Sequence, residues 1–297
     1  MADAEARVGA VFPLKDDNPT TRLPIVTLAL IVLNVLVYFL VQPVDFDAGT
    51  DFTFETAAIP EELTSGEPLS EAEFCAVVSP GSAAMNSLSV ADGVCANPSA
   101  TAPAFPEKNV WLGALYSMFM HGGLMHLGGN MLYLWVFGNN IEDHLGRLKY
   151  LVFYLVAGVA ATVAHVVGDL DSIIPVIGAS GAVAGVMGAY IVWFPWARIR
   201  TIALIALVNL KAWIVLAFWF VSQFFISPSD GVAWLAHVGG FVFGALFALL
   251  ARSSDSFRDQ LWEHKYRTLN PGATWDPRFG GRETVQDGRT PSWYPGP

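Results

Sequence analysis

The charge-free stretch SIIPVIGASGAVAGVMGAYIVWFPWA, residues 172–197, decides the class of fold. It is long enough to cross the hydrocarbon core of a bilayer, which takes roughly 18 to 20 residues. Within it, the segment Gly178-Ala-Ser180-Gly181 introduces a hydroxyl group into an apolar run. A polar group in a membrane span is costly and is usually retained for a function. The stretch therefore predicts a membrane helix that carries a functional serine.

Five further charge-free stretches of similar length occur along the chain. They are residues 23–44, 109–141, 150–168, 212–229 and 231–251. The composition agrees, because 54% of the 297 residues are hydrophobic, 14% are charged and the mean hydropathy is +0.46. These values exclude an ordinary soluble domain. We expect an all-α polytopic membrane protein with six transmembrane helices over residues 23–251, the first helix being retained rather than cleaved as a signal peptide.

The basic residues predict the orientation of the chain. Fifteen of the 16 Lys and Arg residues lie in segments on one side of the six expected helices, and only Lys108 lies on the other. The positive-inside rule then assigns both termini, residues 1–22 and 252–297, to the cytoplasm of a bacterial-type plasma membrane. The polar, Pro/Gly-rich tail predicts a short surface helix at 254–267 and disorder beyond it.

Residues 43–108 then form a long loop outside the membrane. This loop holds eleven carboxylates and one lysine, whereas the rest of the chain is balanced at 15 acids and 15 bases. The acidity of the protein therefore belongs to the loop and does not indicate a nucleic-acid partner. Both cysteines, Cys75 and Cys95, lie in this loop, and an oxidising compartment favours a disulfide between them.

Polar residues on three of the expected helices lie at a common depth. With the amino terminus inside, the second, fourth and sixth helices all begin at the outer face. His126, Ser180 and His237 follow the expected helix starts by about four or five residues, which corresponds to roughly 6 to 8 Å below the interface. Asn130 lies one turn after His126 on the same helix face. The pattern predicts that these side chains meet.

Glycine pairs on two of the helices allow a close approach. Pairs spaced by four residues let helix backbones pack tightly in lipid. They are Gly181 with Gly185 on the fourth helix and Gly240 with Gly244 on the sixth. We expect them to bring Ser180 and His237 within reach, as a nucleophile and its imidazole base require. Ser180 is also expected near a helix start, where free backbone N–H groups could bind an oxyanion.

Three segments together resemble the rhomboid family of intramembrane serine proteases. They are HGGLMHLGGN at 121–130, GASG at 178–181 and AHVGG at 236–240. The resemblance extends over about residues 16–252 and implies that Ser180 is the nucleophile and His237 the general base and acid. It implies that His126 and Asn130 help to stabilise the oxyanion. A Ser-His dyad fits this sequence, since the three helices that carry these residues contain no Asp or Glu as a third member.

The resemblance implies a serine endopeptidase that cleaves single-span transmembrane proteins near the outer membrane face through an acyl-enzyme. We expect no cofactor and no metal, and the partners are transmembrane substrates and the lipid bilayer. The sequence does not define the oligomeric state. Two alternatives stay open: a catalytically inactive rhomboid-like protein that binds membrane clients, and a small transporter. The first is disfavoured by the presence of both dyad residues, and the second by the lack of acidic residues in the expected spans.

One position departs from the family pattern. Rhomboids often have an aromatic residue four positions after the nucleophile to support the histidine ring, but this position is Ala184. Trp234 and Phe241 are the candidates to orient His237 instead. A metal site formed by His121 and His126 is disfavoured, because their i, i+5 spacing does not align them on one helix face.

Overall fold

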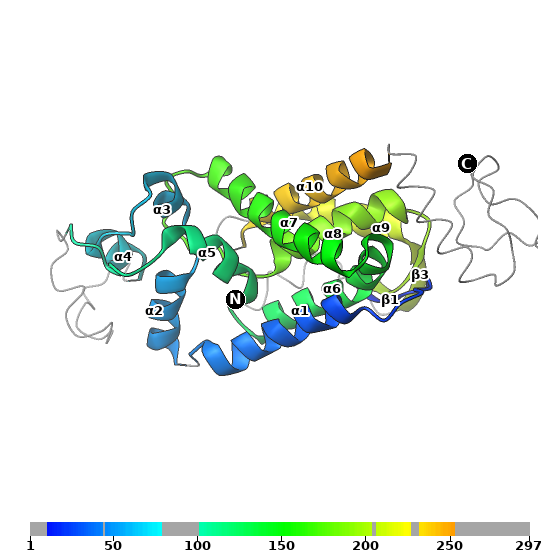
Figure 1. Ribbon diagram of the computed structural model, residues 1–297, viewed down its shortest axis with the longest axis horizontal. Helices are drawn as coiled ribbons and strands as arrows, with labels where there is room; N and C mark the ends of the chain where they lie inside the picture. Colours follow the sequence, from blue (N-terminus) through cyan, green and yellow to red (C-terminus); the bar gives the residue numbers. More distant parts are fainter. Residues whose placement is uncertain (1–10, 44, 79–100, 204–205, 227–231, 253–297) are drawn as a thin grey trace, which may run out of the picture.

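The computed structural model describes residues 11–43, 45–78, 101–203, 206–226 and 232–252. Over these residues the protein is mostly helical, as the sequence predicts (Figure 1). The predicted helix at 254–267 and the predicted disorder of the tail lie outside the described residues.

Each of the six charge-free stretches contains a helix. The helices are α1 (Ile25–Leu36, continued by the π-helix η1, Val37–Val41), α6 (Leu124–Leu145), α7 (Arg147–Gly168), α8 (Ser180–Trp193), α9 (Ala212–Ser222, continued by the 3₁₀-helix η4, Gln223–Phe225) and α10 (Trp234–Arg252). Two short helices, α5 (Val110–Tyr116) and η3 (Ser117–Phe119), precede α6.

Length and hydropathy together separate these six helices into two groups. Two segments, Arg147–Gly168 and Trp234–Ala251, are long and apolar enough to cross a membrane. In contrast, α8 has 14 residues and α9 has 11, which is shorter than the sequence predicts. The reasons are local: residues 172–179 form a loop before α8, and α9 tightens into the 3₁₀-helix η4 after Ser222. The number of membrane spans therefore stays a prediction.

Helix α8 lies at the centre of the bundle and packs most extensively against α10. Ala184, Val186 and Tyr190 of α8 are fully buried. A methyl group added at Gly240 or Gly244 of α10 would approach the carbonyl oxygen of Gly181 or Gly185 closer than 3.0 Å. The two helices are thus in backbone contact along these glycines, as their spacing predicts.

The amino terminus of α1 is held by a buried carboxylate from α6. Glu142, 3% exposed, accepts hydrogen bonds from the N–H groups of Val26 (3.0 Å) and Thr27 (2.8 Å) and from the Thr27 hydroxyl (2.8 Å). The first N–H groups of a helix have no intrahelical partner, and a negative charge there also complements the helix dipole. Glu142 therefore fixes α1 against α6.

A three-stranded antiparallel sheet lies at the end of the molecule where α1 begins (Figure 1). The strands are β1 (Val11–Asp16), β2 (Arg198–Ala203) and β3 (Ala206–Lys211), in the order β1-β2-β3. The all-α expectation missed this sheet. Exposed Arg198 and Arg200 alternate with buried Ile199 and Thr201 in β2, which is the pattern of a half-buried strand.

At the opposite end of the molecule, part of the expected 43–108 loop is folded (Figure 1). It forms three helices, α2 (Phe46–Thr56), α3 (Pro60–Ser65) and α4 (Glu71–Val78), which we call the α2–α4 cap. Its core consists of Phe54, Ile59, Leu69 and Phe74, all at most 5% exposed. Cys75 in α4 is disulfide-bonded. Its expected partner Cys95, the other cysteine of the sequence, lies outside the described residues.

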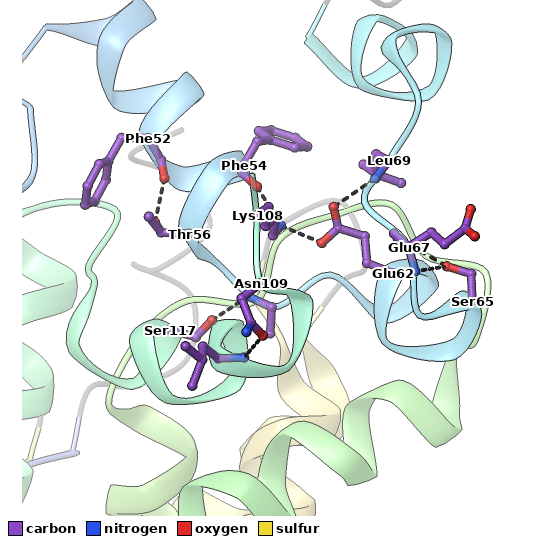
Figure 2. A network of polar contacts seen from close by, with 12 residues as sticks. Phe52, Phe54, Thr56, Glu62, Ser65, Glu67, Leu69, Lys108, Asn109 and Ser117 are labelled. Carbon is purple, nitrogen blue, oxygen red and sulfur yellow. Dashed lines mark hydrogen bonds and ion pairs between the residues drawn. The ribbon is translucent and has the colours of Figure 1, made fainter. Parts of the chain in front are cut away.

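A buried ion pair joins the cap to the chain that precedes α5. Lys108 Nζ contacts Glu62 Oε2 and donates a hydrogen bond to the Phe54 carbonyl (2.6 Å), while Glu62 Oε1 accepts from the Leu69 N–H (3.0 Å) (Figure 2). Both charged side chains are 1% exposed. Burial raises the pKa of Glu62 and lowers the pKa of Lys108, and their mutual hydrogen bond and attraction oppose both shifts.

Candidate active site

Ser180 is the first residue of α8, so it lies at the expected helix start and not four or five residues beyond it as the common depth predicts. The preceding loop contains Pro175 and ends with Gly178, whose φ of 121° is unfavourable for residues with a side chain. Ala179 then adopts helical angles, and the helix begins. Because the first N–H groups of a helix lack intrahelical acceptors, the N–H of Ser180 is available to an oxyanion.

His237 lies in the first turn of α10, directly opposite Ser180. Its Nε2 atom is 2.7 Å from Ser180 Oγ, which is hydrogen-bonding distance. Both residues are half-buried. The contact depends on the glycine-mediated packing of α8 on α10, because a wider helix separation would move the two side chains apart. The arrangement can transfer a proton from the serine hydroxyl to the imidazole ring.

Two residues of the fifth apolar segment surround the His237 ring. The Trp219 ring lies 5.9 Å from it, measured between centroids. Gln223 Oε1 lies 2.7 Å from His237 Nδ1. The two aromatic candidates from the sequence have other neighbours: Trp234 lies against Phe224, and Phe241 packs on Trp219.

Gln223 is a site residue that the sequence does not predict. A glutamine at the end of an apolar stretch is typical of an interfacial position, and 14 residues separate it from His237. In the structure, however, Gln223 is only 4% exposed. The contact with His237, 14 residues later, leaves no local signal in the sequence around residue 223.

His126 lies in the first turn of α6, next to the loop that precedes Ser180. A methyl group built on Gly178 would be 2.7 Å from His126 Nε2 and 3.5 Å from Ser180 Oγ. The imidazole and the hydroxyl therefore flank one small space, which only a glycine leaves open. The His121 ring packs edge-on against His126, with 5.2 Å between centroids.

Asn130 follows one turn later and is 7% exposed. Its Nδ2 atom is buried and has no hydrogen-bond partner among the described residues. Buried donors are almost always paired, so this amide is available to a group that binds near His126. The described part of the chain contains no cluster of three or more metal-binding side chains.

The α2–α4 cap is hydrogen-bonded to the loop before Ser180. The Ser117 hydroxyl accepts from the Ala58 N–H (2.7 Å), and the Ser117 carbonyl accepts from the Gly178 N–H (2.8 Å). The Ala58 carbonyl in turn accepts from the Val176 N–H (2.8 Å). Ala58 lies two residues after α2, between α2 and α3, so the position of the Ser180 loop is linked to the fold of the cap.

The fold and the site together define a class: a bundle of apolar helices with a serine–histidine pair between two closely packed helices. Residues 108–254 match the model of the Rhomboid domain family. The chain therefore carries a rhomboid domain over these residues. Proteins of this family are integral membrane proteins.

Two curated relatives share a short region with the chain. They are the "Presenilin-associated rhomboid-like protein, mitochondrial" of Homo sapiens and that of Pongo abelii. Each is 36% identical to the chain over 58 residues, which is 20% of this chain. The matched region spans 15% of the length of each relative.

Proposed function

We propose that the protein is an intramembrane serine endopeptidase that cleaves transmembrane proteins through a Ser180–His237 dyad. The observation that supports this most is the 2.7 Å contact between Ser180 Oγ and His237 Nε2 at the amino terminus of α8. A serine is a weak nucleophile unless an adjacent base accepts its proton. The rhomboid domain at residues 108–254 supports the same reaction class.

In the acylation step, Ser180 Oγ attacks the scissile carbonyl carbon while His237 Nε2 takes the hydroxyl proton. His237 then gives this proton to the leaving amine as the C–N bond breaks, which leaves an ester on Ser180. Water then attacks the ester carbonyl carbon while His237 Nε2 takes a proton from it. His237 returns this proton to Ser180 Oγ as the ester bond breaks and the second product leaves.

The negative oxygen of each tetrahedral intermediate needs donors that are in position before the reaction. The Ser180 N–H at the start of α8, the His126 ring beside Gly178 and the unpaired Asn130 amide are the three groups assigned to it. Preorganised donors of this kind usually make the largest single contribution to such reactions.

The proposed topology has six membrane helices and both termini in the cytoplasm of a bacterial-type plasma membrane. Basic residues at the sheet end support it, since Lys15, Arg198, Arg200 and Lys211 lie there. The disulfide of Cys75 supports the assignment of the α2–α4 cap to the oxidising outer side.

The proposed substrates are single-span proteins whose helix unwinds easily near the outer face. A membrane helix satisfies its own N–H and C=O groups, so its scissile carbonyl becomes accessible only after local unwinding. Gly and Pro in the outer segment of a substrate favour this unwinding because they are weak helix formers.

The test uses the purified full chain in detergent with a panel of transmembrane substrates and a serine-directed fluorophosphonate. Ser180→Ala and His237→Ala should each reduce cleavage to background while the protein stays folded, and the double variant should be no worse.

His126→Ala and Asn130→Ala should slow turnover about 100- to 1,000-fold, as loss of an oxyanion donor typically does. Substantial cleavage by Ser180→Ala would refute the proposal. If the wild-type protein bound the substrates but neither cleaved them nor reacted with the fluorophosphonate, it would be an inactive client-binding protein. Solute flux that does not depend on Ser180 would indicate a transporter.

A further inference from the structure

Gln223 occupies the junction where α9 tightens into the 3₁₀-helix η4. Its backbone N–H bonds to the Phe220 carbonyl, three residues earlier, instead of the Trp219 carbonyl four residues earlier. The Trp219 carbonyl accepts two side-chain hydrogen bonds instead, from Gln223 Nε2 (3.0 Å) and from the Ser222 hydroxyl (2.6 Å). The change in helix type thus creates a fixed acceptor for the Gln223 amide.

This acceptor decides which way the amide points. A carbonyl oxygen can only accept, so the NH₂ group of Gln223 must face Trp219. The amide oxygen Oε1 then faces His237 Nδ1 at 2.7 Å. Because Oε1 also can only accept, the proton of the neutral imidazole must reside on Nδ1. His237 Nε2 is left with a free lone pair, 2.7 Å from the Ser180 hydroxyl.

We propose that Gln223 is a positioning residue that holds His237 in the tautomer able to act as a base toward Ser180. The inference rests on the proposed function and deepens it. Without an acceptor at Nδ1, the imidazole can carry its proton on Nε2, and it then presents an N–H instead of a lone pair to the serine. A buried amide takes the place here that a carboxylate has in a three-residue catalytic triad.

The same contact acts again during the reaction. When His237 accepts the Ser180 proton, the imidazolium donates from Nδ1 to the Gln223 amide oxygen, and a hydrogen bond from a charged donor is stronger than a neutral one. The Trp219 ring, 5.9 Å from the His237 ring, restricts its movement from the side. The residues that orient the base therefore come from α9 and η4, not from the α8 position occupied by Ala184.

Three variants separate this role from a structural one. Gln223→Met keeps the length of the side chain and removes the acceptor, and Gln223→Glu keeps an acceptor for Nδ1. Ser222→Ala is the matched control, because it removes a bond to the same Trp219 carbonyl and the 3.3 Å bond from Gln223 Nε2 but leaves the acceptor of His237 Nδ1 in place. Gln223→Met should lower kcat about 10- to 100-fold with little change in KM, by analogy with the loss of a hydrogen-bond partner that orients a metal-bound histidine. Gln223→Glu and Ser222→Ala should stay within a few-fold of wild type. Near-normal kcat in Gln223→Met, or an equal loss in Gln223→Glu with the fold intact, would overturn the inference.

A second measurement does not depend on catalysis. In the full chain labelled with ¹⁵N-histidine, the ring-nitrogen shifts report which atom carries the proton at a pH where the ring is neutral, and His237→Ala identifies the signals. We expect the Nδ1–H tautomer in wild type and loss of this preference in Gln223→Met. An Nε2–H tautomer in wild type would refute the role of Gln223 even if Ser180-dependent cleavage is observed. A chain with the expected tautomer that neither cleaves nor labels would refute the proposed function alone.

Discussion

Gly178 lies between the nucleophile and the proposed oxyanion donor and is constrained in two ways. Its φ of 121° disfavours any side chain, and an added methyl group would be 2.7 Å from His126 Nε2. Gly178→Ala should therefore displace the His126 ring as well as strain the backbone. We expect a large loss of turnover together with a lower melting temperature, measured by substrate cleavage and by thermal unfolding.

Gly66 provides a control that isolates the backbone effect. It ends α3 with a φ of 81°, and a methyl group there would have no neighbour within 4 Å. Gly66→Ala should cost about 1 to 2 kcal/mol, the penalty for a left-handed conformation, with little change in turnover. If both variants lost stability and activity equally, crowding of His126 would not be the reason for glycine at position 178.

At the scale of single residues, the sequence predicts the structure best where the backbone restricts the choice of residue. Pro175 and Gly178 disfavour a helix, so the start of α8 at Ser180 could be predicted from the sequence. Gln223 could not, because its burial depends on the change from α-helix to 3₁₀-helix after Ser222 and on the approach of α10. Neither has a signature in the sequence around residue 223.

At the scale of elements, the contact between α8 and α10 predicts that a Gly→Ala substitution lowers stability at one position and raises it at another. Gly244→Ala would bring a methyl group against the Gly185 backbone, and overpacking of this kind costs about 1 to 3 kcal/mol. Gly128→Ala on α6 has no neighbour within 4 Å and should stabilise its helix by up to about 1 kcal/mol. Thermal unfolding of the two variants tests this. Equal effects on the melting temperature would mean that α8 and α10 do not need the close approach.

The helices could be predicted from the sequence where a charge-free apolar stretch marks them. Charge-free stretches located all six helices, but they overestimated the length of α8 because apolar loop residues count toward a run, and that of α9 because the helix tightens to 3₁₀ at Gln223. The sheet was missed for a different reason. Strand β1 contains Pro13 and lies in a polar segment, and its pairing partner β2 begins at Arg198, far away in the sequence. Such non-local pairing leaves only a weak local pattern.

At the scale of the whole molecule, the α2–α4 cap is the part that sequence reasoning described least well. Its segment is acidic and rich in turn-forming residues, which is typical of a loop. Its core of Phe54, Ile59, Leu69 and Phe74 forms only when three short helices pack together. The cap is then connected to the active-site loop through Ala58, so its stability and that of the Ser180 loop are expected to be coupled.

The buried pair of Lys108 and Glu62 tests this coupling, because it joins the cap to the chain before α5. Lys108→Met removes the cation and leaves the carboxylate in an apolar site, and breaking a buried pair in this way typically costs about 3 to 5 kcal/mol. The variant should unfold at a lower temperature at neutral pH. Turnover should fall as well, since the cap contacts Ser117 and Val176 beside the nucleophile.

The cost of Lys108→Met should depend on pH with a definite sign. Burial already raises the pKa of Glu62 above its ordinary 4.5, and the bond and charge of Lys108 lower it, so removal of Lys108 raises this pKa further. The folded variant then keeps the Glu62 proton at pH values where the unfolded chain has lost it. Its stability is therefore fully present below about pH 4.5 and is lost as the pH rises through the raised pKa. The melting-temperature deficit relative to wild type should grow from acid to neutral pH.

The double variant Glu62→Gln/Lys108→Met removes the charge but keeps an oxygen for the Leu69 N–H, so it should recover most of the stability and lose this pH dependence. A deficit that is constant with pH and persists in the double variant would instead assign the effect to the lost hydrogen bond from Lys108 to the Phe54 carbonyl.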